Sequence, residues 1–218
     1  IIDNNSTDET IEIIKQNNFP NIKFLIEKDN GIFDAINKGL DLCDNEIVSI
    51  LHSDDFYDNE NVLQDVLNSF KENGNNDIVF GDLIYVKQND INYNLRYWKP
   101  GVYQNKSFFK GWHPPHPSFF VKKKIYIKYG NYDLKHGNSS DVEMMFRLLS
   151  VNGVNSKYLN KTLVKMRYGG ASNKNIYSII KQNLNILKFL KINFNIYKIL
   201  KFFSYKLIDR LKQFVIRK

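Results

Sequence analysis

The sequence predicts an α/β fold in which a mostly parallel sheet is flanked by helices. Short apolar runs with β-branched residues alternate with helical periodicity over the first third of the chain, in the order strand, helix, strand, helix, strand. Acidic segments directly follow two of these runs, at the positions where the strands of a doubly wound sheet end. The 218 residues, 43% of them apolar, are sufficient for one domain with a core.

The first elements are predicted from periodicity and capping signals. A strand ends at Ile1–Ile2 and an amphipathic helix follows, for which Ser6 and Glu9 form a capping box. The run 47–51 is short and nearly continuously apolar, which is typical of a strand buried on both faces. The other elements expected in this part are a strand over 22–26, a helix over 32–42, and a helix over 60–71 that ends at the Asn73-Gly74 turn.

The middle of the chain continues the mixed pattern and contains one long irregular segment. Four of the five prolines lie between Pro100 and Pro117, together with Trp112, His113 and His116, which indicates a functional loop. The expected elements around it are a strand over 78–86 interrupted at Gly81-Asp82, a strand over 91–98 after a turn at Asn89-Asp90, a strand over 118–121, helices over 122–129 and 141–151, and a strand over 158–166.

The C-terminal segment differs from the rest in charge, and we predict a body over 1–173 and a basic, amphipathic helical tail over 174–218. From Lys174 onward the chain has eleven Lys and Arg and one acid, Asp209, although the net charge of the whole chain is only +8. Apolar stripes run between these basic residues, with a break at 193–195. We favour an in-plane membrane helix attracted to anionic lipid. The alternative is packing onto the body or a second subunit.

Composition excludes several classes of protein. Cys43 is the only cysteine, so the sequence has no disulfide framework and no cysteine-built zinc site. A nucleic-acid binder is disfavoured because the basic excess avoids the body. No stretch is apolar for long enough to span a bilayer. We therefore expect a cytoplasmic protein that is peripheral on the inner face of the plasma membrane.

Two adjacent carboxylates, Asp54 and Asp55, come just after the buried strand over 47–51. Two ionised carboxylates at the end of a buried strand repel each other and lose hydration, which costs free energy unless a positive charge lies beside them. A divalent cation that also binds phosphate oxygens would supply this charge. The alternative is that Ser53-Asp54-Asp55 only caps the helix that begins near Asn59.

Further motifs occur along the chain in a fixed order, and each is weak alone. They are Asp3-Asn4-Asn5-Ser6-Thr7-Asp8, Asp29-Asn30-Gly31-Ile32-Phe33-Asp34-Ala35-Ile36-Asn37-Lys38-Gly39, Ser53-Asp54-Asp55, His116-Pro117-Ser118-Phe119-Phe120, Gly130-Asn131-Tyr132-Asp133, Ser140-Asp141-Val142-Glu143 with Arg147, and Gly169-Gly170-Ala171-Ser172. Together they resemble the family 2 glycosyltransferases of the GT-A fold, in particular bacterial enzymes that build polysaccharide or lipopolysaccharide. The resemblance covers about 1–173 and implies a Rossmann-like nucleotide-diphospho-sugar transferase domain.

The resemblance also implies that the domain is N-terminally incomplete. Family members begin with an additional strand and helix that help to hold the nucleotide, whereas this sequence opens at the second strand. We expect the nucleotide affinity, the stability and the activity of the chain to depend on that part.

The resemblance assigns roles to the acids on the donor side. It implies that Asp55 is the direct ligand of Mn²⁺ or Mg²⁺, and that Asp54 contacts the ribose or a metal-bound water. It implies that Asp3 accepts hydrogen bonds from the nucleotide base, and that Asp29 or Asp34 accepts them from base or ribose. For Asp34, a solvated helix residue is the alternative.

The resemblance assigns the catalytic base to Asp141. An inverting transfer needs a base that removes the proton of the acceptor hydroxyl. Asp141 begins a predicted helix, where the helix dipole favours a carboxylate. The alternative is that Asp141 is simply the N-cap of that helix, although both roles could hold together. Glu143 with Arg147 at i+4 is expected to orient the site or to form a helix salt bridge.

The remaining site residues keep two interpretations each. His116 could contact phosphate or sugar, or could simply pack and hydrogen-bond within the loop. Trp112 could stack on a sugar ring or belong to the core. Arg167, Gly169 and Gly170 could close over the diphosphate, although a plain turn explains the glycines as well.

These expectations combine into one predicted function. The chain would be a metal-dependent, inverting glycosyltransferase that moves a sugar from a nucleoside diphosphate, UDP in the first instance, to a saccharide or lipid-linked acceptor in cell-surface polysaccharide synthesis. The alternatives are a truncated, non-catalytic homologue that binds or assembles other components, and a phosphotransferase or nucleotidyltransferase. The absence of a P-loop motif disfavours the phosphotransferase.

Overall fold

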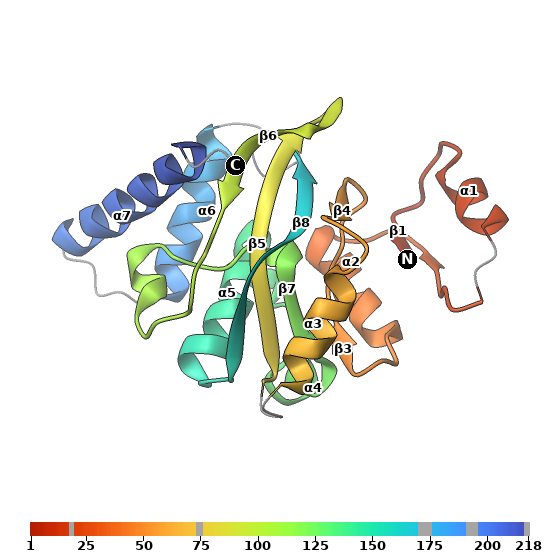
Figure 1. Ribbon diagram of the computed structural model, residues 1–218, viewed down its shortest axis with the longest axis horizontal. Helices are drawn as coiled ribbons and strands as arrows, with labels where there is room; N and C mark the ends of the chain where they lie inside the picture. Colours follow the sequence, from red (N-terminus) through yellow and green to blue (C-terminus); the bar gives the residue numbers. More distant parts are fainter. Residues whose placement is uncertain (18–19, 73–75, 170–175, 191–195, 216–218) are drawn as a thin grey trace.

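A computed structural model of the chain describes residues 1–17, 20–72, 76–169, 176–190 and 196–215 (Figure 1). A six-stranded sheet forms the centre of the molecule, and a separate two-stranded sheet lies at the N-terminal end. Helices pack against the central sheet, and the predicted α/β fold is confirmed.

The central sheet is built around the long, almost entirely buried strand β5 (Ile78–Lys87). Its neighbours are β8 (Ser156–Arg167), which runs parallel to it, and two antiparallel strands, β7 (Phe119–Lys122) and β6 (Asp90–Trp98). The short strands β3 (Ile47–Val48) and β4 (Asp55–Tyr57) pair antiparallel with β7 and β8, respectively. Among the described strands of this sheet, only β5 and β8 pair in parallel.

The expectation of a mostly parallel sheet is therefore wrong in its detail, for two local reasons. A tight turn at Gln88–Asn89 joins β5 to β6, and strands joined by so short a connection can only pair antiparallel. The apolar run over 47–51 keeps strand geometry only at Ile47–Val48, where β7 offers partners. After it the chain turns, and Asp55 begins the separate strand β4.

The N-terminal unit consists of β1 (Ile2–Asp3), β2 (Leu25–Ile26), which pairs with it in parallel, and α1 (Thr10–Gln16). It stands at the opposite end of the molecule from α7 and is joined to the body through α2 (Ile32–Leu42) (Figure 1). The predicted capping box is absent. Instead, the backbone N–H and the hydroxyl of Ser6 donate to the carboxylate of Asp3 at 2.7 and 2.6 Å.

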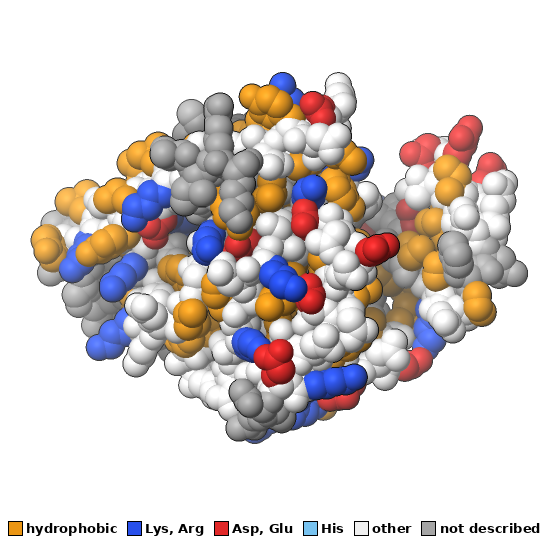
Figure 2. All heavy atoms as spheres, viewed as in Figure 1, with side chains coloured by type: hydrophobic (Ala, Val, Ile, Leu, Met, Phe, Trp, Pro, Cys, Tyr) orange, Lys and Arg blue, Asp and Glu red, His pale blue; other side chains and the backbone are white. Residues whose placement is uncertain are grey.

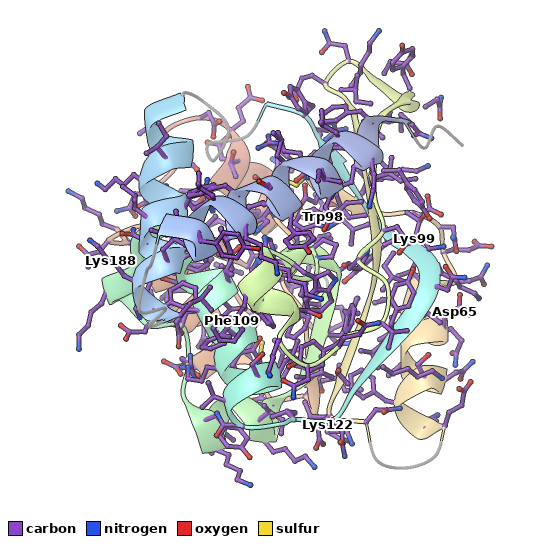
Figure 3. All side chains as sticks on the ribbon, turned by 90° about the vertical axis from the view of Figure 1, so that its left-hand side faces the viewer. Asp65, Trp98, Lys99, Phe109, Lys122 and Lys188 are labelled. Carbon is purple, nitrogen blue, oxygen red and sulfur yellow. The ribbon has the colours of Figure 1, made fainter. Side chains whose placement is uncertain are left out.

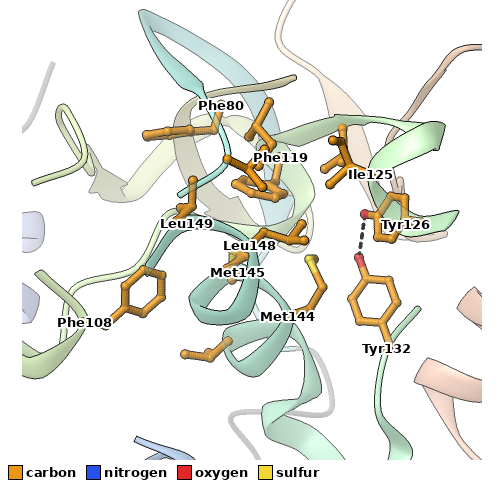
Figure 4. Close-up of a cluster of buried hydrophobic side chains, with 14 of the residues drawn as sticks. Phe80, Phe108, Phe119, Ile125, Tyr126, Tyr132, Met144, Met145, Leu148 and Leu149 are labelled. Atoms are coloured by element: carbon orange, nitrogen blue, oxygen red, sulfur yellow. Dashed lines mark hydrogen bonds between the residues drawn. The ribbon is translucent and has the colours of Figure 1, made fainter. Parts of the chain in front are cut away.

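The core lies on both faces of β5. One face packs against α3 (Val62–Lys71), and the other against α4 (Lys123–Tyr129) and α5 (Ser140–Phe146), which continues as a π-helical turn over Arg147–Val151. Figure 4 shows the second face, where Met144, Met145 and Leu148 meet Phe119. Three 3₁₀ turns complete the described part, at Ser107–Lys110, His116–Ser118 and Leu134–Ser139.

The C-terminal helices α6 (Ile176–Phe189) and α7 (Ile196–Val215) pack onto the body, which was the alternative to a free membrane helix. Apolar side chains from both helices belong to the main core; they are Ile186, Leu187, Leu190 and Phe202. Helix α7 lies across β6 beside Trp98 (Figure 3). No helix in the described ranges is long and apolar enough to cross a membrane. The predicted break at 193–195 and the turn at Asn73-Gly74 lie outside the described residues.

Candidate active site

A cavity of about 1100 Å³ lies between α2, the segment that joins β3 to β4, the end of β6, α5 and α7. It is large enough for a ligand of nucleotide-sugar size. Six of the predicted site residues line it, although they are far apart in the sequence. These are Asp54, Asp55, Trp112, His116, Asp141 and Arg167.

Asp55 is a buried carboxylate without partners. It begins β4, where its backbone pairs with Met166 of β8. Both of its carboxylate oxygens are shielded from solvent and have no hydrogen-bond partner among the described residues. Burial, together with the charge of exposed Asp54, raises the pKa of Asp55 to about 7, and the cation of Arg167 opposes this rise. An ionised carboxylate that is buried without partners destabilises the folded chain unless a positive charge lies next to it.

The alternative that Asp54 and Asp55 only cap a helix is wrong. Helix α3 begins at Val62, well after the acid pair. The turn before it is closed by the side chain of Asn59, which accepts a hydrogen bond from the N–H of Asn61 at 3.0 Å. Asp54 and Asp55 therefore do not cap helix α3.

The orphaned oxygens of Asp55 fit a divalent cation. No cluster of three or more His, Cys, Asp or Glu gathers in the part of the chain that the structure describes. The protein would therefore supply one or two carboxylates, those of Asp55 and Asp54, and leave the other coordination positions to ligand oxygens. Mg²⁺ is commonly bound in this way, by one or two carboxylates with substrate phosphates.

Asp141 is the second unsatisfied acid of the cavity. It lies in the first turn of α5, where the backbone N–H groups of Asp141 and Val142 hydrogen-bond its carboxylate. Its Oδ1 is buried and has no hydrogen-bond partner among the described residues. Burial raises the pKa of Asp141 to about 6, while those N–H groups and the charge of Lys206 lower it. The unpartnered Oδ1 is therefore available to accept a proton.

The two acids face a shared space. The buried hydroxyl of Tyr85, on β5, feels the charges of both Asp55 and Asp141, and burial is the main reason that its pKa is raised. Tyr85 also lines the cavity. Asp55 and Asp141 therefore both lie near Tyr85 on one cavity.

His116 and Trp112 have structural partners as well as cavity-facing positions. The Nε2 of His116 lies 2.8 Å from the hydroxyl of Tyr132, and burial lowers the pKa of His116 to about 3. The Nε1–H of Trp112 donates to the carbonyl of Pro100 at 2.7 Å, and its ring packs edge-on against Phe80. Both residues thus combine the two interpretations, since each is fixed by packing and still borders the cavity.

The acids predicted to hold the nucleotide lie beside the cavity and not in its lining. Asp3 is buried and both of its oxygens are used by Ser6. The side chain of Asn4 accepts a hydrogen bond from the backbone N–H of Asp29 at 2.9 Å, so the first two motifs are in contact. Asp34 accepts from the N–H of Asn30, which lowers the pKa of Asp34. Their role in nucleotide binding stays a prediction.

The loop after β8 is described only in part. The guanidinium of Arg167 lies over the ring of Phe56 and donates to the backbone carbonyl of Asp54 at 3.4 Å. Arg167 therefore accompanies the acid pair. Gly170, Ala171 and Ser172 of the late motif lie outside the described residues, as does the predicted boundary at 173/174. Glu143 and Arg147 form the expected helix salt bridge, at 2.9 Å.

Sequence reasoning missed the contribution of α7 to the cavity. Lys206, Arg210 and Gln213 all line it, together with Arg96 of β6. The signal was present in the sequence, because the three α7 residues are spaced i, i+4 and i+7 and therefore lie on one face of the helix. They were interpreted as part of a membrane-facing surface.

A mixed sheet flanked by helices, with a large cavity lined by acids beside it, defines the class of α/β proteins that bind nucleotide-sized ligands at the edge of the sheet. Comparison with known proteins narrows the class. Residues 1–130 match the family model of glycosyl transferase family 2. The chain belongs to this family of sugar-transferring enzymes.

Curated relatives agree with this family. The "PGL/p-HBAD biosynthesis glycosyltransferase" of Mycobacterium bovis and that of Mycobacterium tuberculosis are each 27% identical over 179 residues, which is 79% of this chain and 66% of theirs. The chain thus spans just under two thirds of the length of these relatives.

Solved structures confirm the GT-A fold. A crystal structure of S. aureus TarS 1-349 in complex with UDP-GlcNAc superimposes with a TM-score of 0.59 at 15% sequence identity, over 97% of this chain and 62% of that one. A structure of S. aureus TarS gives 0.57, over 94% of this chain and 36% of that one. At this identity the likeness shows the fold alone.

Proposed function

We propose that this chain transfers a sugar from a nucleoside diphosphate sugar, a UDP-sugar in the first instance, to a saccharide or lipid-linked acceptor of the cell surface. The observation that carries the proposal is that two carboxylates on one cavity, those of Asp55 and Asp141, have buried oxygens without a hydrogen-bond partner among the described residues. The family supports sugar transfer. The neighbouring TarS structure holds UDP-GlcNAc, which supports a UDP-sugar donor here.

In this proposal Asp141 is the catalytic base. Its free Oδ1 accepts the proton of the acceptor hydroxyl while that oxygen bonds to the anomeric carbon of the sugar. The bond from the anomeric carbon to the diphosphate oxygen breaks, and the nucleoside diphosphate leaves with the electron pair. Attack from the face opposite the leaving group inverts the anomeric centre, which requires no covalent intermediate with the protein.

Asp55 and Asp54 would hold Mn²⁺ or Mg²⁺. When bound, the cation neutralises the charge that develops on the leaving diphosphate. Arg167, next to the acid pair, adds a fixed positive charge on the same side. The buried oxygens of Asp55 are thereby satisfied by the ligand complex and not by the protein.

The experiment is a calorimetric titration of UDP with and without Mn²⁺. UDP is expected to bind the unsubstituted chain only with the metal, and Asp55→Ala is expected to abolish that binding. Asp65→Ala is the matched control, because Asp65 of α3 pairs with Lys161 at the surface, outside the cavity lining (Figure 3). Metal-dependent UDP binding that survives Asp55→Ala would contradict the role of Asp55.

We further propose that the outer face of α7 rests on an anionic bilayer, at the cytoplasmic face of the plasma membrane. Tyr197, Leu200 and Leu207 are 59–67% exposed, and Lys201 lies exposed between them. Figure 2 shows apolar and basic side chains gathered over this end of the molecule. Apolar side chains with interspersed lysines match the boundary between acyl chains and anionic headgroups.

Vesicle sedimentation tests this surface. The chain is expected to bind vesicles of phosphatidylglycerol and phosphatidylcholine, and Leu200→Glu with Leu207→Glu is expected to prevent binding. Leu63→Glu serves as the control, since Leu63 is 49% exposed on α3 at another part of the surface. Equal binding by both variants would contradict the proposal.

A further inference from the structure

Three cationic side chains, Arg96, Lys206 and Arg210, line the same cavity as Asp141. Arg96 comes from β6, and the other two come from one face of α7. None of them forms an ion pair within 4 Å of a carboxylate in the described ranges. The Nζ of Lys206 instead donates to the Oδ1 of Asn183, and the Nε of Arg96 to the Oε1 of Gln213, both at 2.7 Å.

These cations are held in place and partly desolvated. Arg96 is only 9% exposed, and its guanidinium lies over the rings of Tyr85 and Trp98. Burial lowers the pKa of Lys206 to about 8; the charge of Asp141 raises it and that of Arg210 lowers it. Burial is also the main cause that lowers the pKa of Arg96. Buried charges of one sign destabilise a fold unless a ligand of the opposite sign offsets them.

The carboxylates on the cavity wall do not balance these charges. Asp141 interacts with Lys206, and Arg210 interacts with both Lys206 and Arg96, so one carboxylate accompanies three cations. Asp209, the other acid that α7 brings to the cavity, lies 3.5 Å from the exposed Lys212. An excess of positive charge therefore remains on the wall of the cavity that α7 and β6 form.

The donor diphosphate does not explain the cluster. The acid pair Asp54 and Asp55 has its own cation, Arg167, which contacts the backbone of Asp54. Lys206, in contrast, has its strongest carboxylate interaction with Asp141. In the proposed reaction Asp141 receives the proton of the acceptor hydroxyl, so a cation near it faces the acceptor and not the leaving group.

We propose that Arg96, Lys206 and Arg210 form an acceptor subsite for an anionic group, a phosphate ester carried by the acceptor close to its reacting hydroxyl. The inference rests on the proposed function, because it takes Asp141 to mark the acceptor end. Two guanidinium groups and one ammonium group suit a phosphate, which accepts paired hydrogen bonds from guanidinium groups. In the free chain these charges, which have no carboxylate partner within 4 Å in the described ranges, destabilise the fold, and the phosphate of the acceptor would neutralise them.

The test uses methyl phosphate as the probe and the full chain saturated with UDP and Mg²⁺. Calorimetry is expected to show methyl phosphate binding in the presence of UDP, weakened about tenfold or more by Arg210→Gln and by Lys206→Met. Arg210 makes no hydrogen bond or ion pair to a described residue, so Arg210→Gln should fold normally. Lys188→Met is the matched control, since Lys188 is exposed on α6 and lies outside the cavity lining.

Each outcome decides the proposal. Binding that UDP displaces would place the phosphate in the donor site and overturn it, as would equal affinity in Arg210→Gln and the unsubstituted chain. Methyl glucuronide, titrated in parallel, distinguishes a carboxylate from a phosphate, and tighter binding of the glucuronide would overturn the choice of phosphate. If UDP itself fails to bind, the proposed function fails, and the same variants titrated without UDP still test the cationic subsite.

Discussion

Replacing Asp141 by Asn is expected to make the protein more stable and the enzyme much slower. The carboxylate lies in a cavity wall with one oxygen unpartnered, and burial raises its pKa from the ordinary 3.8 to about 6. A group whose pKa is higher in the folded chain than in the unfolded chain costs stability wherever it is ionised. Asn keeps the shape and can still accept the helix N–H groups, but it carries no charge.

The magnitude follows from the pKa difference. Each pKa step is worth about 1.4 kcal/mol, so above pH 6 the ionised carboxylate costs the folded state about 3 kcal/mol. Because the residue is only half-buried, solvent screening reduces this to about 1–2 kcal/mol. Asp141→Asn should therefore raise the melting temperature by about 3–6 °C at pH 8. Between pH 4 and 6 the folded chain takes up the proton first, so the gain at pH 5 should be about half of that at pH 8.

Thermal unfolding of the ligand-free chain at pH 8 and pH 5 measures this effect. Asp133→Asn is the matched control, because Asp133 is a capping carboxylate that accepts from the N–H of Lys135, and Asn can replace it in that bond. In the same variant, transfer should fall about 10²–10⁴-fold with little loss of UDP affinity. A loss of stability at pH 8, a gain that does not depend on pH, or a parallel loss of UDP affinity would refute the reasoning.

The unsubstituted chain should lose transfer activity about tenfold per pH step below pH 6, because only ionised Asp141 can accept the proton; a profile flat from pH 5 to 8 would remove Asp141 from proton transfer. Gly81→Ala should lower the free energy of unfolding by about 1–3 kcal/mol, since the new Cβ would lie 2.6 Å from the Cγ of Leu163. Urea titration measures this change, and Gly39→Ala, inside α2 and against a flexible side chain, should cost far less. Arg147→Met should cost about 2–4 kcal/mol in the same assay, because it leaves a half-buried carboxylate and three backbone carbonyls without their donor. A loss below 1 kcal/mol would show that this cluster is not structural.

Local signals predicted the helices well and the strands less well. The helix over 32–42 was predicted with the bounds that the structure has. Its signals, the apolar spacing and the glycine just before the first turn, are local in the sequence. The pattern of the run over 47–51 predicts one strand, yet only Ile47–Val48 pairs with β7. The length of a paired strand depends on the backbone partners in the neighbouring strand, which the run itself does not specify. Asp55 was predicted at a strand end and lies at a strand start, because its partner Met166 belongs to a distant segment.

In the candidate site, too, local motifs predicted some of the residues and tertiary packing determines the others. The acids Asp55 and Asp141 stand in motifs that the sequence displays openly, and the structure brings both to one cavity. The contribution of Lys206 depends on how α7 docks across β6, which no local pattern specifies. A helix with alternating apolar and basic residues suits a membrane and a protein surface equally, so only tertiary packing distinguishes its two faces.

Gly111 sets how closely α7 can approach the body. A Cβ added there would lie 2.8 Å from the Cβ of Lys206, and the φ of +75° favours glycine. The helix that rests on this glycine presents Lys206 and Arg210 inward and Leu207 outward, so one rigid element carries both proposed binding surfaces. Binding free energies that act through one such element are reciprocal: whatever factor lipid contributes to acceptor affinity, acceptor must contribute to lipid affinity. If lipid strengthens acceptor binding, bound acceptor must strengthen lipid binding by the same factor.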